Sequence, residues 1–194
     1  MKGGKRLDEQ EIIRKAKEND HTSFEKLVIQ YKSLVEKLAF QFGIRPEQIP
    51  DIVQETFIKV YQNLDQFHKG KFSTWLYQIT LNTARDSHRK NKRNEKIVHK
   101  AKKNYETPTS INLYFESDAH LLLHEAIQAL DVKYRMPLIL FYFHDQTYDE
   151  IAMILKLKPS AVKTRMHRGR ANLKSLYEKL EKEEADSNGR QTIG

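Results

Sequence analysis

The sequence contains no cysteine and few residues that break helices, with seven glycines and five prolines among 194 residues. The absence of cysteine excludes disulfide bonds and thiolate metal sites. Apolar residues recur with a helical period along most of the chain, whereas the strict alternation that is typical of strands does not occur. We therefore expect an all-α fold.

Long hydrophobic runs are also absent. The most apolar stretch, MPLILFYF at residues 136–143, is far shorter than the roughly 20 residues that span a bilayer. The first twenty residues contain no apolar signal core. Both observations predict a cytoplasmic protein without direct membrane insertion.

The charge of the chain is positive, with 34 Lys and Arg against 26 Asp and Glu, which gives a formal net charge of +8. Such a chain favours a polyanionic partner. The cations are concentrated in two places: residues 156–174 hold seven of them and no acid, and residues 85–103 are nearly as one-sided.

A hydrophobic fraction of 39% is low for one well-filled core, and two small helical domains fit the chain better. The helical period fails after residue 93, where lysines and turn formers predict a flexible linker of about two dozen residues. We expect four segments: a domain at 1–93, a linker at 94–118, a second domain at 119–180 and a disordered tail at 181–194. In the first domain the expected helices lie near 8–18, 22–42, 50–67 and 71–93.

The second domain contains the pattern of a helix-turn-helix. Thr147 and Glu150 form a capping box, and Pro159 is suited to the first position of the next helix. Val162 and Met166 begin the inward seam of that helix. Its other face is basic and polar, with Ser160, Lys163, Thr164, His167, Arg168 and Ala171. A recognition helix in the major groove has this arrangement, and a hairpin whose lysines are merely solvated is the alternative.

Two features of the first domain suggest further contacts. In the third helix Ile58 lies outward among acids, either as a stray apolar residue or as a protein contact. The helix at 71–93 begins amphipathic and ends as a cationic rod, so its second half is suited to lie along phosphates. The aromatic rings of Phe72, Trp75 and Tyr77 either stack on unpaired bases or pack in the core.

Two long segments resemble bacterial sigma factors of the extracytoplasmic-function group in the sigma-70 family. DIVQETFIKVYQNLDQF, followed by KFSTWLYQITLNTARDSHRKNKR, resembles region 2. ALDVKYRMPLILFYFHDQTYDEIAMILKLKPSAVKTRMHRGRANL resembles region 4. The resemblance implies an RNA polymerase sigma factor that directs promoter recognition and strand opening in transcription initiation. It would not itself be an enzyme, and it would need no cofactor.

The resemblance, with the patterns above, implies three sets of binding residues. The largest-subunit clamp helices of core RNA polymerase would contact Asp51, Gln54, Glu55 and Ile58. The melted strand of the −10 element would contact Phe72, Trp75, Asn82, Arg85, Asp86 and Arg89, and the loop at 66–73 would capture a flipped base. The −35 duplex would contact Ser160, Lys163, Thr164, His167 and Arg168. The polymerase flap and an anti-sigma factor are further implied partners.

The turn of the helix-turn-helix departs from the family, because Lys156 stands where glycine is usual, and we expect a turn of different shape. Two other functions remain as alternatives. One is a free-standing helix-turn-helix regulator. The other is a metalloenzyme in which His120 and His124 share a metal, although Leu121 stands where zincin chemistry needs a glutamate.

Overall fold

The computed structural model of the chain describes the backbone of residues 4–98 and 118–191 and the side chains of residues 9–90 and 121–185. All regular elements within these ranges are helices, which confirms the predicted class. The chain divides into two compact units, Met1–His99 and Lys100–Gly194, which we call unit 1 and unit 2.

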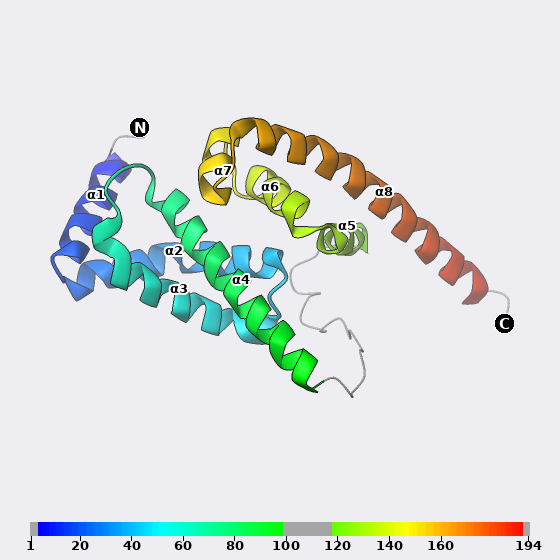
Figure 1. Cartoon of the computed structure of the whole chain (residues 1–194), viewed down its shortest axis with the longest axis horizontal. Helices are drawn as coiled ribbons and strands as arrows, with labels where there is room; N and C mark the ends of the chain where they lie inside the picture. The colour runs from blue at the N-terminus through cyan, green and yellow to red at the C-terminus, as the bar shows by residue number, and fades with distance from the viewer. Residues whose placement is uncertain (1–3, 99–117, 192–194) are drawn as a thin grey trace. The chain divides into compact units, whose positions relative to one another are not determined.

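Unit 1 is a helical bundle built around one apolar cluster. Its helices are α1 (Gly4–Lys17), α2 (His21–Phe42), α3 (Ile49–Asn63) and α4 (Phe72–Val98), with short 3₁₀ turns at Pro46–Gln48 and Leu64–Gln66. α1 packs on α2, and α2, α3 and α4 pack on one another (Figure 1). The buried cluster contains Ile13, Ala16, Leu27, Val35, Val53, Phe57, Val60, Leu64, Phe72 and Leu76.

Local signals set the ends of α2. The Asp20 side chain accepts a hydrogen bond from the Thr22 backbone N–H and caps the helix one residue earlier than the sequence suggested. At the other end Gly43 adopts a φ of 98°, and its N–H donates to the carbonyls of Ala39 and Phe40. A residue with a side chain would be strained in this conformation, so the glycine ends the helix as expected.

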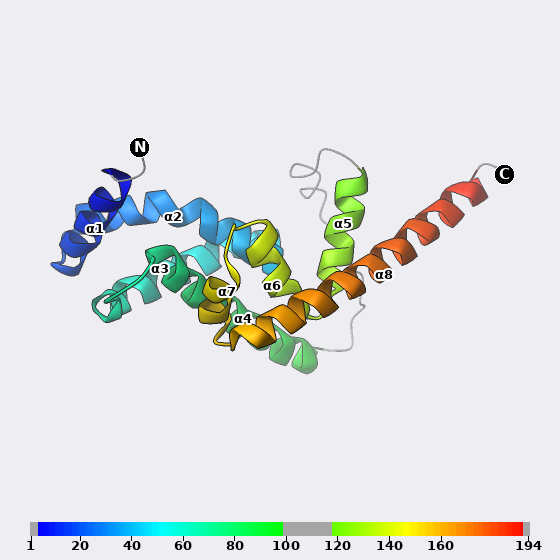
Figure 2. The same ribbon diagram turned by 90° about the horizontal axis from the view of Figure 1, so that it is seen from above.

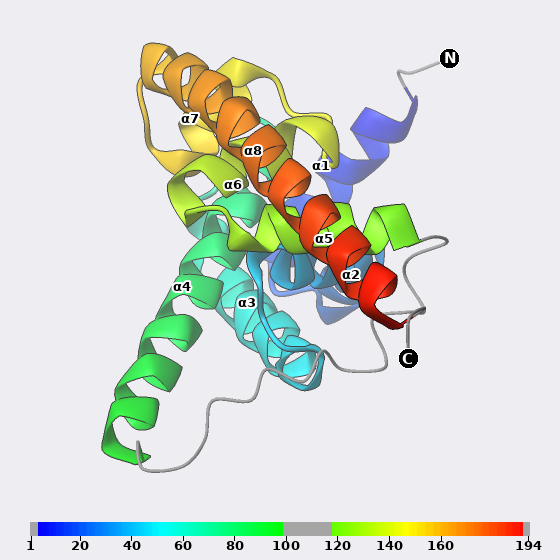
Figure 3. The same ribbon diagram turned by 90° about the vertical axis from the view of Figure 1, so that its right-hand side faces the viewer.

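α4 is longer than the sequence suggested. Its first half is buried on one side, with Leu76, Leu81 and Ala84 almost fully inaccessible to solvent. The helix then continues to Val98, and Figure 3 shows its last turns extending past α3. The helix therefore extends five residues past residue 93, where the sequence had placed its end, and residues 99–117 lie outside the described part of the chain.

Unit 2 is organised by one long helix. Its elements are α5 (Asp118–Ala129), α6 (Val132–Tyr142), α7 (Tyr148–Leu155) and α8 (Pro159–Gln191), and α8 packs against each of the other three (Figure 2). The tail from residue 181, expected to be disordered, is helical as far as Gln191. Lysine and glutamate are good helix formers, and pairs one turn apart, such as Lys179–Glu183 at 3.6 Å, support α8.

α6 and α8 approach each other closely at Gly169. A Cβ atom added to this glycine would lie 3.2 Å from Leu138 Cδ1 and 3.3 Å from the carbonyl oxygen of Tyr134. Both distances are tighter than ordinary van der Waals contact, so an added side chain would require its neighbours to shift by a few tenths of an ångström. The absence of a side chain at Gly169 therefore suits the close packing of α6 and α8.

The helix-turn-helix forms as predicted. Glu150 N–H donates to Thr147 Oγ1 at 3.3 Å, and Glu150 Oε2 accepts from Thr147 N–H at 2.8 Å, which completes the capping box of α7. α7 ends at Lys156, which has a φ of 54° and a ψ of 50° and whose N–H donates to the carbonyls of Ala152 and Met153. The expectation of a turn of different shape is therefore wrong, because Lys156 keeps the left-handed conformation that suits glycine.

We expect the substitution Lys156→Gly to raise the free energy of unfolding of unit 2 by about 1 kcal/mol, because it removes the steric cost of the left-handed conformation. Thermal denaturation of the full chain measures this as an increase of several degrees in the unit 2 transition. Lys156→Ala is the control, since it removes the charge and keeps the strain. Equal stabilisation by the two variants would contradict the backbone explanation.

Candidate nucleic-acid and protein interfaces

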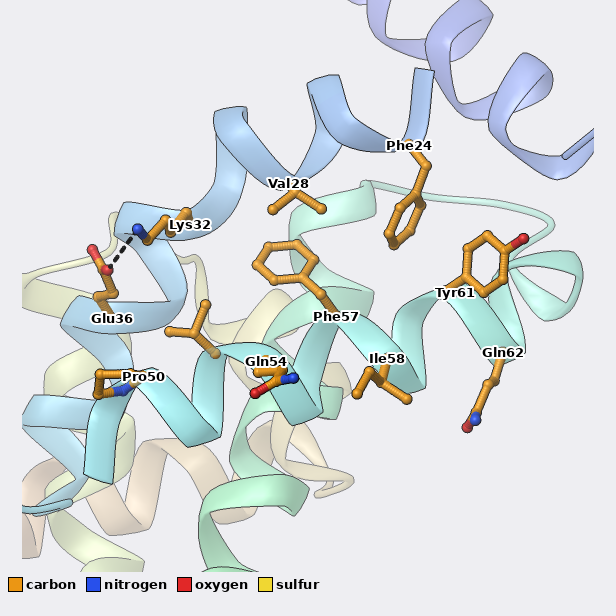
Figure 4. Close-up of a pocket in the computed structure, with 11 residues that line it drawn as sticks. Phe24, Val28, Lys32, Glu36, Pro50, Gln54, Phe57, Ile58, Tyr61 and Gln62 are labelled. Carbon is orange, nitrogen blue, oxygen red and sulfur yellow. Dashed lines mark ion pairs between the residues drawn. The ribbon is translucent and has the colours of Figure 1, made fainter. Parts of the chain in front are cut away.

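An open groove of about 630 Å³ lies between α2 and α3 of unit 1 (Figure 4). Apolar side chains form most of it, including Phe24, Val28, Val53, Phe57, Ile58 and Tyr61. The rings of Phe24 and Tyr61 meet edge to face, with 5.0 Å between their centroids. Such a groove can accept apolar side chains of a partner helix.

All four residues predicted to contact polymerase are exposed on α3. Gln54 and Ile58 line the groove, and Asp51 and Glu55 extend the same surface with negative charge. Ile58 is 46% exposed, and its position in the groove explains an apolar residue among acids. Sequence reasoning missed the α2 wall of the groove and did not find Tyr61, which lines the groove and is 40% exposed.

Phe72 is a core residue. Only 2% of its surface is accessible, and its ring lies 5.1 Å from Tyr31 and 5.5 Å from Phe67 between centroids. The prediction that Phe72 offers a ring face to an unpaired base is therefore wrong, and the same holds for Tyr77, which is 3% exposed. Aromatic spacing on a helix is the same for core packing and for base stacking, so the pattern did not distinguish them.

Trp75 lies at the edge of the core. It is half-buried against the apolar cluster, with ring centroids 5.5 Å from Phe67 and 5.7 Å from Phe72. The preceding loop is held by Lys17, whose ammonium donates to the carbonyl oxygen of Phe67. Gly70 in the same loop has a φ of 98°, while His68 and Lys69 are exposed beside it. The loop is thus fixed at Phe67 and open to solvent beyond it.

The remaining α4 residues form a polar face. Asn82, Asp86 and Arg89 are exposed at successive turns, and Arg85 donates to Asn82 Oδ1 at 3.3 Å. Burial lowers the pKa of the Arg85 guanidinium from its usual value, with repulsion from Arg89 as a smaller cause. The spacing of these residues at three and four positions places them on one face of α4.

Lys59 connects this face to α3, and sequence reasoning did not find it. Its ammonium lies 2.8 Å from Glu55 Oε1 and 3.7 Å from Asp86 Oδ2, and it donates to Thr83 Oγ1 at 3.2 Å. The pair of Glu55 with Lys59 has the i, i+4 spacing of one helix, but the contacts of Lys59 with Asp86 and Thr83 depend on the packing of α3 against α4.

The outward face of α8 carries the predicted −35 residues. Ser160, Lys163, Thr164, His167 and Arg168 are all exposed. The intervening Val162 and Met166 are buried, with 0% and 1% of their surfaces accessible. The helix therefore separates its apolar and polar sides as the sequence predicted, and the first turns of α8 present the polar side to solvent.

The proposed histidine metal pair gains no support from the described residues. The ring of His124 is half-buried, 3.4 Å from Gln128 Nε2, and burial lowers the pKa of the imidazole. The side chain of His120 lies outside the described residues. Among those described, no three His, Asp or Glu side chains are grouped as metal ligands, and no helix is long and apolar enough to cross a membrane.

Two family models match the chain in the order expected for the two units. The sigma-70 region 2 model matches residues 27–94, and the sigma-70 region 4 model matches residues 120–173. Together they cover most of both helical units. The chain therefore belongs to the sigma-70 family of RNA polymerase sigma factors.

The relatives define the group within this family. SigW of Bacillus subtilis, an ECF RNA polymerase sigma factor, is 31% identical over 183 residues, covering 87% of this chain and 96% of SigW. The sigma-E factor of Haemophilus influenzae is 27% identical over 185 residues, covering 90% of this chain and 97% of that protein. SigE of Mycolicibacterium smegmatis is 29% identical, and the chain spans 65% of its length. This protein is an extracytoplasmic-function sigma factor.

Solved structures share the fold. CnrH, in complex with the cytosolic domain of CnrY, matches with a TM-score of 0.66 and 25% identity over 86% of this chain and 95% of CnrH. The sigma factor RpoE of Bartonella quintana, in complex with the anti-sigma factor NepR, has the same TM-score at 22% identity, over 80% of this chain and 96% of RpoE. A free-standing regulator is not favoured, because it would leave the region 2 match unexplained.

Proposed function

We propose that the two units divide the work of this sigma factor, with unit 1 binding core RNA polymerase and the melted −10 strand and unit 2 binding the −35 duplex. One observation carries this division: each unit has a helix that is buried on one side and polar, with basic residues, on the other. The segments for these roles are residues 1–93 and 119–180, as the sequence suggested.

The polymerase contact in this proposal is the α3 surface with its groove. Asp51 and Glu55 supply negative charge beside the apolar opening at Ile58. A partner helix with an apolar row and basic flanks is complementary to this surface. The clamp helices of the largest subunit are the proposed partner, and the polymerase flap would contact unit 2.

The −10 contact is the polar face of α4 with the loop at 66–73. Asn82, Asp86 and Arg89 would follow the strand, and the half-buried Trp75 would border it with a ring edge. A protein binds single-stranded DNA through contacts with the backbone and stacking on the bases, and it does not read hydrogen-bond patterns in a groove. Strand opening would be driven by capture of unpaired bases, so the protein would need no nucleotide hydrolysis, no cofactor and no catalytic group of its own.

The −35 contact is the exposed face of α8. Lys163 and Arg168 are suited to contact guanine bases and phosphates. Polar contacts through shorter side chains would come from Ser160, Thr164 and His167. We also propose cytoplasmic localisation and restraint by an anti-sigma factor. The RpoE structure contains such a partner, although its identity to this chain supports only the fold.

Transcription with purified core polymerase tests the proposal. We expect the chain to co-elute with core polymerase on a size-exclusion column and to direct initiation at defined sites in a random promoter library. Core polymerase alone is the control. A free-standing regulator would neither co-elute nor create defined start sites, and that result would overturn the proposed function.

We expect Ile58→Asp to weaken binding to core polymerase by about 1–2 kcal/mol, or roughly 5- to 30-fold in Kd, because it places a charge in the apolar opening of the groove. Fluorescence anisotropy of the labelled chain measures this. The matched control is Ile29→Asp, which changes a more exposed isoleucine of α2, 72% accessible, outside the groove. Equal losses in both variants would remove the groove from the interface.

For unit 2, we expect Lys163→Ala and Arg168→Ala to weaken binding of the polymerase complex to the −35 duplex. A bidentate base contact would cost about 1–3 kcal/mol, and a phosphate contact less. A panel of promoters with single −35 changes measures discrimination between sequences. Lys174→Ala is the control, since Lys174 is paired with Glu178 at 3.7 Å farther along α8. An equal loss on every promoter would exclude base readout by that residue.

A further inference from the structure

The ammonium of Lys59 is shared by two helices of unit 1. It lies 2.8 Å from Glu55 Oε1 on α3, 3.7 Å from Asp86 Oδ2 on α4, and 3.2 Å from Thr83 Oγ1. Glu55 Oε1 and Thr83 Oγ1 are within hydrogen-bonding distance of the ammonium, and Asp86 Oδ2 lies at ion-pair distance. The side chain of Lys59 is 32% exposed, against 51% for Glu55 and 62% for Asp86, so the lysine is the most buried of the three side chains.

The two carboxylates belong to different proposed interfaces. Glu55 lies on the surface assigned to polymerase, and Asp86 lies on the face assigned to the −10 strand. The inference therefore rests on the proposed function. The charge of Lys59 is shared by both carboxylates, with Arg85 as a second cation that attracts Asp86, so a change in the surroundings of one carboxylate alters the compensation of the other.

A polymerase cation that approaches Glu55 competes with Lys59 for this carboxylate and repels the ammonium. Both effects move Lys59 toward Asp86 and Thr83, because the interaction between charges falls with distance. Asp86 is then more fully neutralised. An uncompensated carboxylate repels DNA phosphates, so this shift favours binding of the strand along α4.

We propose that Lys59 is a positioning residue that couples polymerase binding at Glu55 to promoter binding at Asp86. Coupling of this kind is reciprocal, and the strand tightens polymerase binding by the same factor. Ion pairs near the surface contribute modestly, so the factor is about three- to ten-fold. In this proposal the Lys59 ammonium shifts between Glu55 and Asp86, and each partner biases that shift.

Lys59→Met tests this inference, with Lys37→Met, a change at an exposed lysine of α2, as the matched control. Two dissociation constants are measured with the full chain by fluorescence anisotropy. The first is for core polymerase. The second is for the polymerase complex with a labelled single strand, copied from the −10 region of a promoter selected in the transcription experiment.

We expect opposite effects on the two steps. Lys59→Met releases Glu55, so polymerase binds with unchanged or higher affinity. The strand binds about three- to ten-fold more weakly, because Asp86 has lost the positive charge of Lys59. A damaged fold would weaken both steps. Lys59→Arg, which keeps the charge, retains wild-type behaviour. Lys59→Gln is the second variant if the methionine variant does not fold.

The double variant K59M/D86N separates coupling from direct DNA contact. If Lys59 acts by neutralising Asp86, the double variant binds the strand as tightly as Asp86→Asn alone, so any direct contribution of Asp86 to strand binding cancels in the comparison. If Lys59 itself contacts phosphate, affinity stays low, and the inference is overturned. Equal weakening of both steps, or no change in either, also overturns it. A wild-type chain that does not bind polymerase overturns the proposed function together with this inference.

Discussion

The burial of one face of α4 is the constraint on which unit 1 depends. Leu76, Thr80 and Thr83 are completely inaccessible to solvent, and Leu81 and Ala84 nearly so. The hydroxyl of Thr80 donates to the carbonyl of Leu76 at 2.9 Å, so this polar group is satisfied within its own helix. With this face packed against α2 and α3, the opposite face of the described part of α4 is the one that solvent reaches.

Unit 2 is organised in the same way, with one face of a helix buried and the other face exposed to solvent. Val162 and Met166 fix the orientation of α8, and the polar residues between them are presented to solvent. The turn before α8 keeps its left-handed shape at Lys156 because the N–H of this residue satisfies two carbonyls at the end of α7. Backbone hydrogen bonds thus outweigh the steric preference of the side chain.

Patterns within one helix were predictable, and contacts between helices were not. The capping box at Thr147, the start of α8 at Pro159 and the two sides of α8 all follow from local spacing, and the structure has them. Phe72 was misassigned because its position in the helix suits both a core residue and a residue that stacks on a DNA base. Only its packing against Tyr31 and Phe67 shows that it is a core residue. The end of α8 was missed because a charged composition was taken for disorder, although its lysines and glutamates are spaced to pair.

Gly169 limits which residues can stand where α6 contacts α8. A side chain at this position would begin 3.2 Å from Leu138 Cδ1 and 3.3 Å from the carbonyl oxygen of Tyr134. The leucine methyl can shift with its rotamer, whereas the backbone carbonyl can move only with α6. Even an alanine at this position would therefore require a displacement of a few tenths of an ångström between the two helices.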